Sequence, residues 1–309
     1  MAPRFYRKLA VLAKIETVYG TDPTPTGAAN AIQMTNATVN PLEGEQVSRD
    51  LMLPYLGMQG VILTGTYVKI DGEVEIAGAG AAGDAPAYGP LLRACGLAET
   101  ITVGTDVQYD PVSSGFEAVT LYFNHDGVNH IALGSRGNVS FSLVPKQIPH
   151  YKFSFSGLLG TIADVALPTV DLSAFVTPVP VSKLNTTFTL HGWTAVAESL
   201  ALDAGIQVEP RFLIGDENIQ LVDRNPSGTA VVEARSLATI NWFNIAKART
   251  RGVLAAQHGI AAGNIVKFDA PAVEIGRPAE GQTQKIINYS LPLMLCTDAG
   301  DDEFKITVK

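Results

Sequence analysis

The sequence predicts an all-β-dominated protein with minor helical content, in which two tandem β-sandwich or β-barrel domains each carry one flanking helix. Three observations lead to this fold class. Short runs of alternating apolar and polar residues recur along the chain, two segments have helical periodicity, and a set of short sequence features occurs twice in the same order.

The alternating runs are bounded by Gly, Pro, Asn or Asp, as is typical of half-buried strands separated by turns. They predict a β-rich fold throughout the chain. The clearest runs are Thr66 to Ile76, Ala118 to Phe123, Asn138 to Val144, Tyr151 to Phe155, Thr186 to Leu190, Ile265 to Phe268 and Lys285 to Leu291.

Helical periodicity is found over Tyr88 to Leu97 and over Ala238 to Arg249, where apolar residues return at three- and four-residue spacing. A third, short helix is expected over Leu9 to Tyr19, ending at Gly20. The following segment, Thr21 to Gly27, is rich in Pro and Thr and predicts an extended arm.

The internal repeat gives the domain organisation. Gly137-Asn138-Val139 is followed by a proline eight positions after the glycine, and so is Gly263-Asn264-Ile265. A Val-Glu pair precedes each predicted helix, at Val74-Glu75 and at Val232-Glu233. The distance from Val-Glu to Gly-Asn is longer in the first copy, which predicts a hairpin insertion at about 100–129. We expect an N-terminal arm (1–35), a first domain (36–165), a linker (166–182) and a second domain (183–309).

Composition excludes several classes of protein. No apolar stretch approaches the ~20 residues that a membrane helix needs, so we expect no membrane insertion, and we recognise no export signal at the N-terminus. The net charge of −8 and a pI near 5.1, without a basic cluster, argue against tight nucleic-acid binding. Cys95 and Cys296 lie in apolar surroundings and are expected to be buried and reduced.

The glycine-rich segment Gly78 to Gly83 matches the dinucleotide-binding pattern G-x-G-x-x-G and follows a predicted strand. That pattern requires a helix to start directly after the strand, with its N-terminus facing a pyrophosphate. Pro86 stops such a helix, and the segments that follow resemble antiparallel strands. We favour a flexible loop leading into the helix at Tyr88, and no cofactor.

No other segment supports catalysis or metal binding. The five histidines are scattered, without metal-ligand spacing. The His125-Asp126 pair falls on an expected hairpin turn, and the acidic cluster of residues 298–303 lacks the ligand spacing of a calcium loop. The sequence therefore predicts a protein that is not an enzyme.

One predicted strand separates charge from apolar surface. Lys69, Asp71, Glu73 and Glu75 alternate with apolar residues, so one face of the strand is charged and mainly acidic. In an isolated domain this would be the solvent face. In a closed ring it would line a water-filled channel.

Two stretches, Leu12 to Pro25 (LAKIETVYGTDPTP) and Asp84 to Leu97 (DAPAYGPLLRACGL), resemble the major tail tube proteins of long, non-contractile-tailed bacteriophages. The resemblance is clearest from Leu9 to Gly160. It implies a structural virion protein with a tail-tube-type β-sandwich and one helix per domain. The resemblance further implies that the inner sheets of six such domains form a barrel around a lumen, and that the rings stack through a long loop and terminal arms.

The duplication changes the expected stoichiometry. A ring of six domains needs three two-domain chains, giving a pseudo-sixfold homotrimer, with a homohexamer as the alternative. Expected partners are further copies of the chain, a tape-measure protein, tail-end proteins and DNA in transit, with assembly in the host cytoplasm. The lumen candidates are Asp71, Glu73, Glu75 and Glu233, and the ring-stacking candidates are Pro23, Pro25, Leu51, Met52, Leu53, Tyr55, Leu56 and Met58.

Two other functions stay open at this point. One is a secreted β-assembly, such as the tube of a type VI secretion system, which would share the composition and ring formation. The other is a nucleotide-binding enzyme that uses Gly78 to Gly83.

Overall fold

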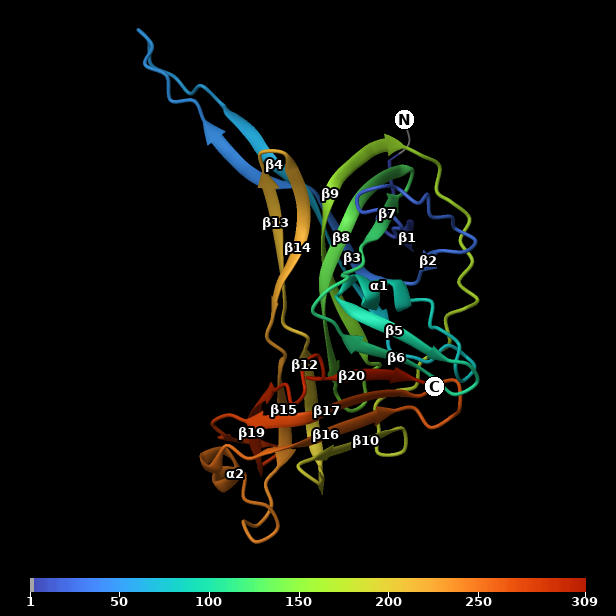
Figure 1. Ribbon diagram of the computed structural model, residues 1–309, viewed down its shortest axis with the longest axis vertical. Helices are drawn as coiled ribbons and strands as arrows, with labels where there is room; N and C mark the ends of the chain where they lie inside the picture. The colour runs from blue at the N-terminus through green and yellow to red at the C-terminus, as the bar shows by residue number, and fades with distance from the viewer. Residues whose placement is uncertain (1–2) are drawn as a thin grey trace.

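The computed structural model describes residues 3–309, and its regular secondary structure consists almost wholly of antiparallel strands (Figure 1). Residues 1 and 2 of the expected N-terminal arm lie outside this range. The first half contains β1 (Leu9–Ile15), β2 (Ala31–Ile32), β3 (Thr35–Ser48), β4 (Val61–Glu75), α1 (Gly89–Ala94), β5 (Leu97–Thr102), β6 (Asp106–Pro111), β7 (Val119–His125), β8 (Val128–Leu143) and β9 (His150–Asp164).

The second half follows a segment without helix or strand. It contains β10 (Thr186–Leu190), β11 (Trp193–Thr194), β12 (Ala197–Asp203), β13 (Ile206–Leu213), β14 (Asp216–Arg224), β15 (Ser227–Glu233), α2 (Trp242–Ala248), β16 (Arg251–His258), β17 (Val266–Ile275), β18 (Ala279–Thr283), β19 (Ile286–Leu295) and β20 (Lys305–Val308).

The two halves have the same strand order. In the first half, β3, β4, β9, β8, β7 and β1 are hydrogen-bonded neighbours in that sequence. In the second half the corresponding order is β12, β15, β19, β17, β16 and β10, with β18 extending β17 along the edge of β19. Each half has one helix. Along the chain, α1 lies between β4 and β7, and α2 lies between β15 and β16.

Strand β8 joins the two halves into one sheet. Its last four residues pair with β12, where β7 has ended, from Ser140 opposite Asp203 to Leu143 opposite Leu200. The result is a continuous run of eight strands, β3-β4-β9-β8-β12-β15-β19-β18. A second junction pairs β20 with β6. No strand pairing among residues 3–309 closes this sheet into a barrel.

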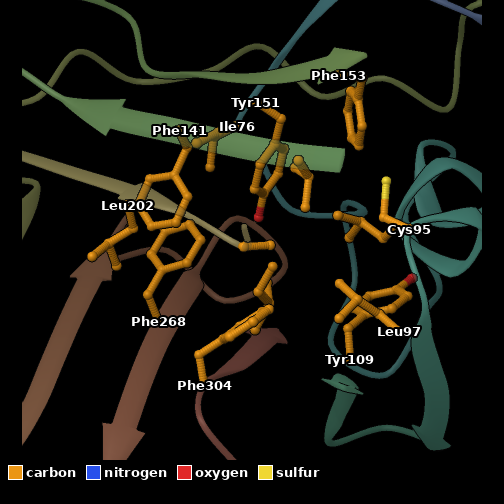
Figure 2. Packing of buried hydrophobic residues seen from close by; sticks show 14 of the residues in the cluster. Ile76, Cys95, Leu97, Tyr109, Phe141, Tyr151, Phe153, Leu202, Phe268 and Phe304 are labelled. Carbon is orange, nitrogen blue, oxygen red and sulfur yellow. The ribbon is translucent and has the colours of Figure 1, made fainter. Parts of the chain in front are cut away.

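The two halves also share a hydrophobic core (Figure 2). Phe141 of β8 stacks on Phe268 of β17, with the ring centroids 3.8 Å apart, and Tyr151 of β9 contacts both rings. Leu202 and Phe304 line the same cluster from the second half. Buried aromatic contacts of this kind favour one fixed arrangement of the two halves.

Both main helices are confirmed, but they are shorter than the periodicity predicts. A proline at the start of α1 supplies a favourable first turn. Helix α2 is capped by Asn241, whose side chain accepts a hydrogen bond from the backbone N–H of Asn244. No helix of residues 3–309 has the length and apolarity needed to cross a bilayer.

The prediction of a helix over Leu9 to Tyr19 is wrong. Residues Leu9–Ile15 form β1, which pairs along its whole length with β7 and buries Ala10, Val11, Leu12 and Ala13. This strand is covered on both faces. It therefore shows a continuous apolar run, which does not distinguish a buried strand from a helix.

Residues 100–129 do not form a single hairpin. They cover most of the β5–β6 hairpin, an irregular connection and β7, which turns into β8 at Asp126-Gly127. Since β7 occupies the position that β16 has in the second half, only the β5–β6 hairpin and its connections lack a counterpart there. That hairpin borders β20 of the second half.

Candidate assembly surfaces

The four residues expected to line a lumen share one face of the continuous sheet. Asp71, Glu73 and Glu75 alternate along β4 with the buried Val68, Ile70 and Val74, so their side chains lie on the side away from the core. Glu233 ends β15 and follows the buried Val232, which gives it the same orientation.

Strand register extends this face across all eight strands. Glu73 lies opposite Lys152 of β9, Lys152 opposite Ser140 of β8, and Ser140 opposite Asp203 of β12. Ser, Thr, Asn and charged residues predominate on this face, and Val231, Pro292 and Met294 interrupt it toward β19. We call it the polar face, and its members include Thr38, Asn40, Lys69, Asp71, Glu73, Glu75, Asn138, Ser140, Ser142, Lys152, Ser154, Ser156, Asp203, Ser227, Thr229, Glu233, Asn288 and Ser290.

Several charges on the polar face are paired. Lys152 lies 3.8 Å from Glu73, Lys69 lies 4.0 Å from Asp71, and Arg235 lies 3.2 Å from Glu233. These side chains are a quarter or more exposed, and exposed pairs contribute only about 0–1 kcal/mol. Because carboxylates outnumber lysines among the members named above, the face as a whole keeps an acidic excess.

The chain between Leu42 and Gly65, which contains the ring-stacking candidates Leu51 to Met58, forms a long hairpin that leaves the body of the molecule, at the upper left of Figure 1. Strands β3 and β4 run up to Ser48 and from Val61, and residues 49–60 form the tip. Gln59 bridges the tip by bonding both the N–H and the C=O of Leu51.

The tip is strongly apolar and exposed. Met52, Leu56 and Met58 are at least 93% exposed, and Tyr55 is 69% exposed. Leu51 and Leu53 are exposed to a smaller extent. An apolar cluster held away from the core of its own chain is typical of an interaction surface.

Pro23 and Pro25 are placed differently from the tip. Pro25 is buried and Pro23 is half-buried against the chain itself, with the carbonyl of Pro23 accepting a hydrogen bond from Lys14. Farther along the arm, Gly27 bonds Asp171 of the linker and packs against Thr169. In this conformation the arm contacts its own chain, and the two prolines offer little surface to a second copy.

The second half has a corresponding hairpin, β13–β14, which lies against the first half at one end of the polar face. Arg136 of β8 holds it. The guanidinium donates to the carbonyl of Ile219 in β14 and to the carbonyls of Phe116 and Glu117 in the first half. Phe212 of β13 packs on Tyr67 and Gly65 of β4.

Arg136 is 9% exposed and lies over the ring of Tyr19, 4.9 Å from the centroid. Burial lowers the pKa of Arg136 and raises the pKa of Tyr19. The hydroxyl of Tyr19 in turn accepts a hydrogen bond from the N–H of Ile219. Sequence reasoning missed this cluster. The only signal is that Arg136 is the sole Lys, Arg, Asp or Glu residue of β8.

Glu16 fixes the backbone on both sides of the Tyr19 ring. This buried carboxylate accepts hydrogen bonds from the N–H groups of Gly20 and Gly134 and from the hydroxyl of Thr120. Gly134 has a φ of +55°, and a Cβ there would lie 2.7 Å from the Tyr19 ring. Carboxylates that accept several backbone bonds hold loops in fixed positions.

The glycine-rich segment does not form a nucleotide loop. The N–H of Gly78 donates to the side chain of Asn264, and the N–H of Gly80 donates to the carbonyl of Gly263. A Cβ on Gly78 would lie 2.1 Å from that same carbonyl. Helix α1 begins only at Gly89 and leads into an antiparallel strand. The glycines allow the two halves to approach closely.

The cysteines, the His125-Asp126 pair and the acidic cluster of residues 298–303 are packed or hydrogen-bonded within the fold. Cys95 is buried, Cys296 is half-buried, and both are free thiols. His125 contacts the carbonyl of Tyr6, and Asp126 turns β7 into β8. Asp302 accepts bonds from three backbone N–H groups of the turn before β20. Within residues 3–309, no group of three or more His, Cys, Asp or Glu residues is arranged to hold a metal.

Comparison with known proteins adds one finding. A family model described as phage tail tube protein matches residues 7–294, which is nearly the whole chain and includes both halves. No curated protein gives a significant match.

Proposed function

The chain belongs to the phage tail tube protein family, and from this premise we propose that three copies close into a ring whose stacked repeats form the hollow tail tube. One observation carries the proposal. A single chain already contains an eight-stranded arc with its core on one face and a mainly polar surface on the other.

The β8–β12 junction supports the proposed ring size. Within the chain, the end of β8 in the first half pairs with β12 of the second half. We propose that the same contact between copies extends the arc around a lumen, with each chain contributing two domains, residues 36–165 and 183–309. Three chains then give six domains in a pseudo-sixfold ring, whereas a homohexamer of this chain would contain twelve.

The polar face would line the lumen. Asp71, Glu73, Glu75 and Glu233 are repeated around the ring and would repel the phosphates of DNA in transit. The hydroxyl and amide groups between them offer weak, sequence-independent contacts. The tube would pass the genome without retaining it.

The β3–β4 tip would connect successive rings. Its exposed residues Leu51, Met52, Leu53, Tyr55, Leu56 and Met58 need an apolar partner, and the copies of a neighbouring ring supply one. The equivalent hairpin in the second half lies against its own chain. The first half of each chain would therefore make most of the contacts between rings.

In this role the protein is a component of the virion. Its partners would be other copies, a tape-measure protein inside the growing tube, the proteins at the two tail ends and DNA during ejection, with assembly in the host cytoplasm. Electron microscopy of the purified protein tests the proposal. Rings or hollow tubes support it, and a protein that stays monomeric at high concentration contradicts it.

Charge reversal tests the lumen assignment. We expect Asp71→Lys combined with Glu73→Lys to leave tube assembly intact and to slow DNA ejection several-fold, because lysines on the polar face would bind phosphate. Fluorescence of ejected DNA after receptor triggering measures the rate. The matched control is Asp84→Lys with Asp171→Lys, a reversal of the same size at exposed loop positions outside the polar face. Wild-type ejection kinetics in the double mutant of β4 would remove these residues from the lumen.

A further inference from the structure

We infer that copies join by antiparallel pairing of β18 in one copy with β3 in a second copy, in a register that places Ala279 opposite Asn40 of the second copy. The inference rests on the proposed function and specifies the contact that the ring needs. It is derived from strand pairing inside the single chain.

The arc ends in two free strand edges. Among residues 3–309, β3 pairs only with β4, and β18 pairs only with β19. All five residues of β18 are exposed, as are Thr38 and Asn40 on β3. A free edge presents unpaired N–H and C=O groups and is a template for another strand.

The first step of the register is the match between β8 and β18. In both halves a row of directly opposed residues starts at the glutamate of the Val-Glu pair and crosses two further strands. These equivalent rows are Glu75–His150–Ser142 and Glu233–Asn288–Gly281. Gly281 of β18 therefore occupies the position of Ser142 in β8, and Ala279 occupies the position of Ser140.

The second step is the match between β3 and β12. Thr38 lies opposite Asp71, four residues before Glu75. Ala201 lies opposite Thr229, which is likewise four residues before the glutamate of its strand. Thr38 of β3 therefore occupies the position of Ala201 in β12, and Asn40 occupies the position of Asp203.

The register of the β8–β12 pairing inside the chain then predicts the register of the β18–β3 pairing between copies. Ala201 lies opposite Ser142, and Asp203 lies opposite Ser140. Replacing each residue by its counterpart puts Thr38 of the second copy opposite Gly281, Val39 opposite Glu280 and Asn40 opposite Ala279. Thr38, Asn40, Gly281 and Ala279 all belong to the polar face, so the lumen lining continues from one copy to the next.

The pairing has the geometry that a ring needs. Strands β3 and β18 are different surfaces of the chain, so the contact is head-to-tail, and an open row of copies keeps one free edge at each of its two ends until the ring closes. Closure removes both edges from every copy. A single chain with two unpaired strand edges has a strong tendency to pair with other chains. A closed ring has no unpaired edge of this kind left.

Paired cysteines test the register. In a Cys296→Ser background, which leaves only the buried Cys95, Asn40→Cys with Ala279→Cys should form disulfides between copies under mild oxidation. The matched control combines Asn40→Cys with Thr283→Cys. Thr283 lies on the same face of β18 but about 13 Å farther along, at 3.3 Å per residue.

Non-reducing gels and electron microscopy give separable outcomes. We expect covalent dimers and trimers from the Asn40–Ala279 pair, none larger than a trimer, and at least ten-fold less product from the control. Rings that form without this cross-link, or that cross-link better in the control, overturn the register and leave the tube function standing. A ladder beyond the trimer contradicts a three-copy ring. Absence of any ring or tube, with no cross-link, overturns both the register and the proposed function.

Discussion

Substitution of the hairpin tip is expected to abolish tube formation while leaving the folded chain intact. In Met52→Ser, Leu56→Ser, Met58→Ser, three side chains that are almost fully exposed in the single chain become polar. The fold loses nothing measurable, because surface changes of this kind are usually within about 0.5 kcal/mol. Each buried apolar side chain is worth about 1.5–3 kcal/mol at an interface, so every copy loses several kcal/mol of stacking energy. Electron microscopy should show single rings in place of tubes.

The matched control changes the same number of exposed apolar side chains elsewhere. Val103→Ser, Leu184→Ser, Ile214→Ser removes three side chains that are at least 75% exposed and lie outside the tip. It should assemble as the wild type does. Tubes of normal length from the tip variant would show that the tip does not connect rings.

Removal of Arg136 is expected to give the largest loss of stability from a single polar substitution. Arg136→Met leaves the carbonyls of Phe116, Glu117 and Ile219 without their donor. Losing a buried, charge-assisted group that serves several acceptors costs about 3–5 kcal/mol. Denaturant titration should show this loss. Limited proteolysis should cut first within β13–β14, because that hairpin loses its attachment to the first half.

Two further variants interpret the result. Arg136→Lys should recover only part of the stability, since an ammonium group cannot reach three carbonyls in the arrangement that a planar guanidinium serves. Arg277→Met, at an exposed position, should be neutral. If Arg136→Met unfolds at the wild-type denaturant concentration, Arg136 does not hold the hairpin.

Much of the fold follows from local pattern. The run Thr186 to Leu190 is β10 residue for residue, because a half-buried strand between turns alternates strictly. The two helices were also found, since their apolar residues recur at three and four positions. The helix prediction is wrong for Leu9–Ile15 for the opposite reason, because a strand covered on both faces shows no alternation.

Other features depend on contacts between distant residues and leave little trace in the sequence. The β8–β12 junction is a pairing of backbones, and backbone pairing does not require particular side chains. The repeat predicted two copies of a fold without showing that their sheets are joined. The acidic residues of β4 were found by alternation, whereas Asp203 and the serines of the polar face were missed, because their shared face is defined by register across strands.

Arg136 and Glu16 illustrate a third kind of limit. Each is a charged residue that the chain buries, and composition-based reasoning places charges at the surface. Their partners are mostly backbone groups and a tyrosine, which no spacing rule connects. An isolated charge inside a strand of small and apolar residues is the signal that a search for such sites should use.

The number of copies per ring tests the central claim most directly. Native mass spectrometry of single rings from the Met52→Ser, Leu56→Ser, Met58→Ser variant measures it without interference from stacking. We expect three times the 32.7 kDa mass of one chain, with the six domains visible as a pseudo-sixfold ring in class averages. A ring of six chains would contradict the proposal that one chain supplies two of the six tube domains.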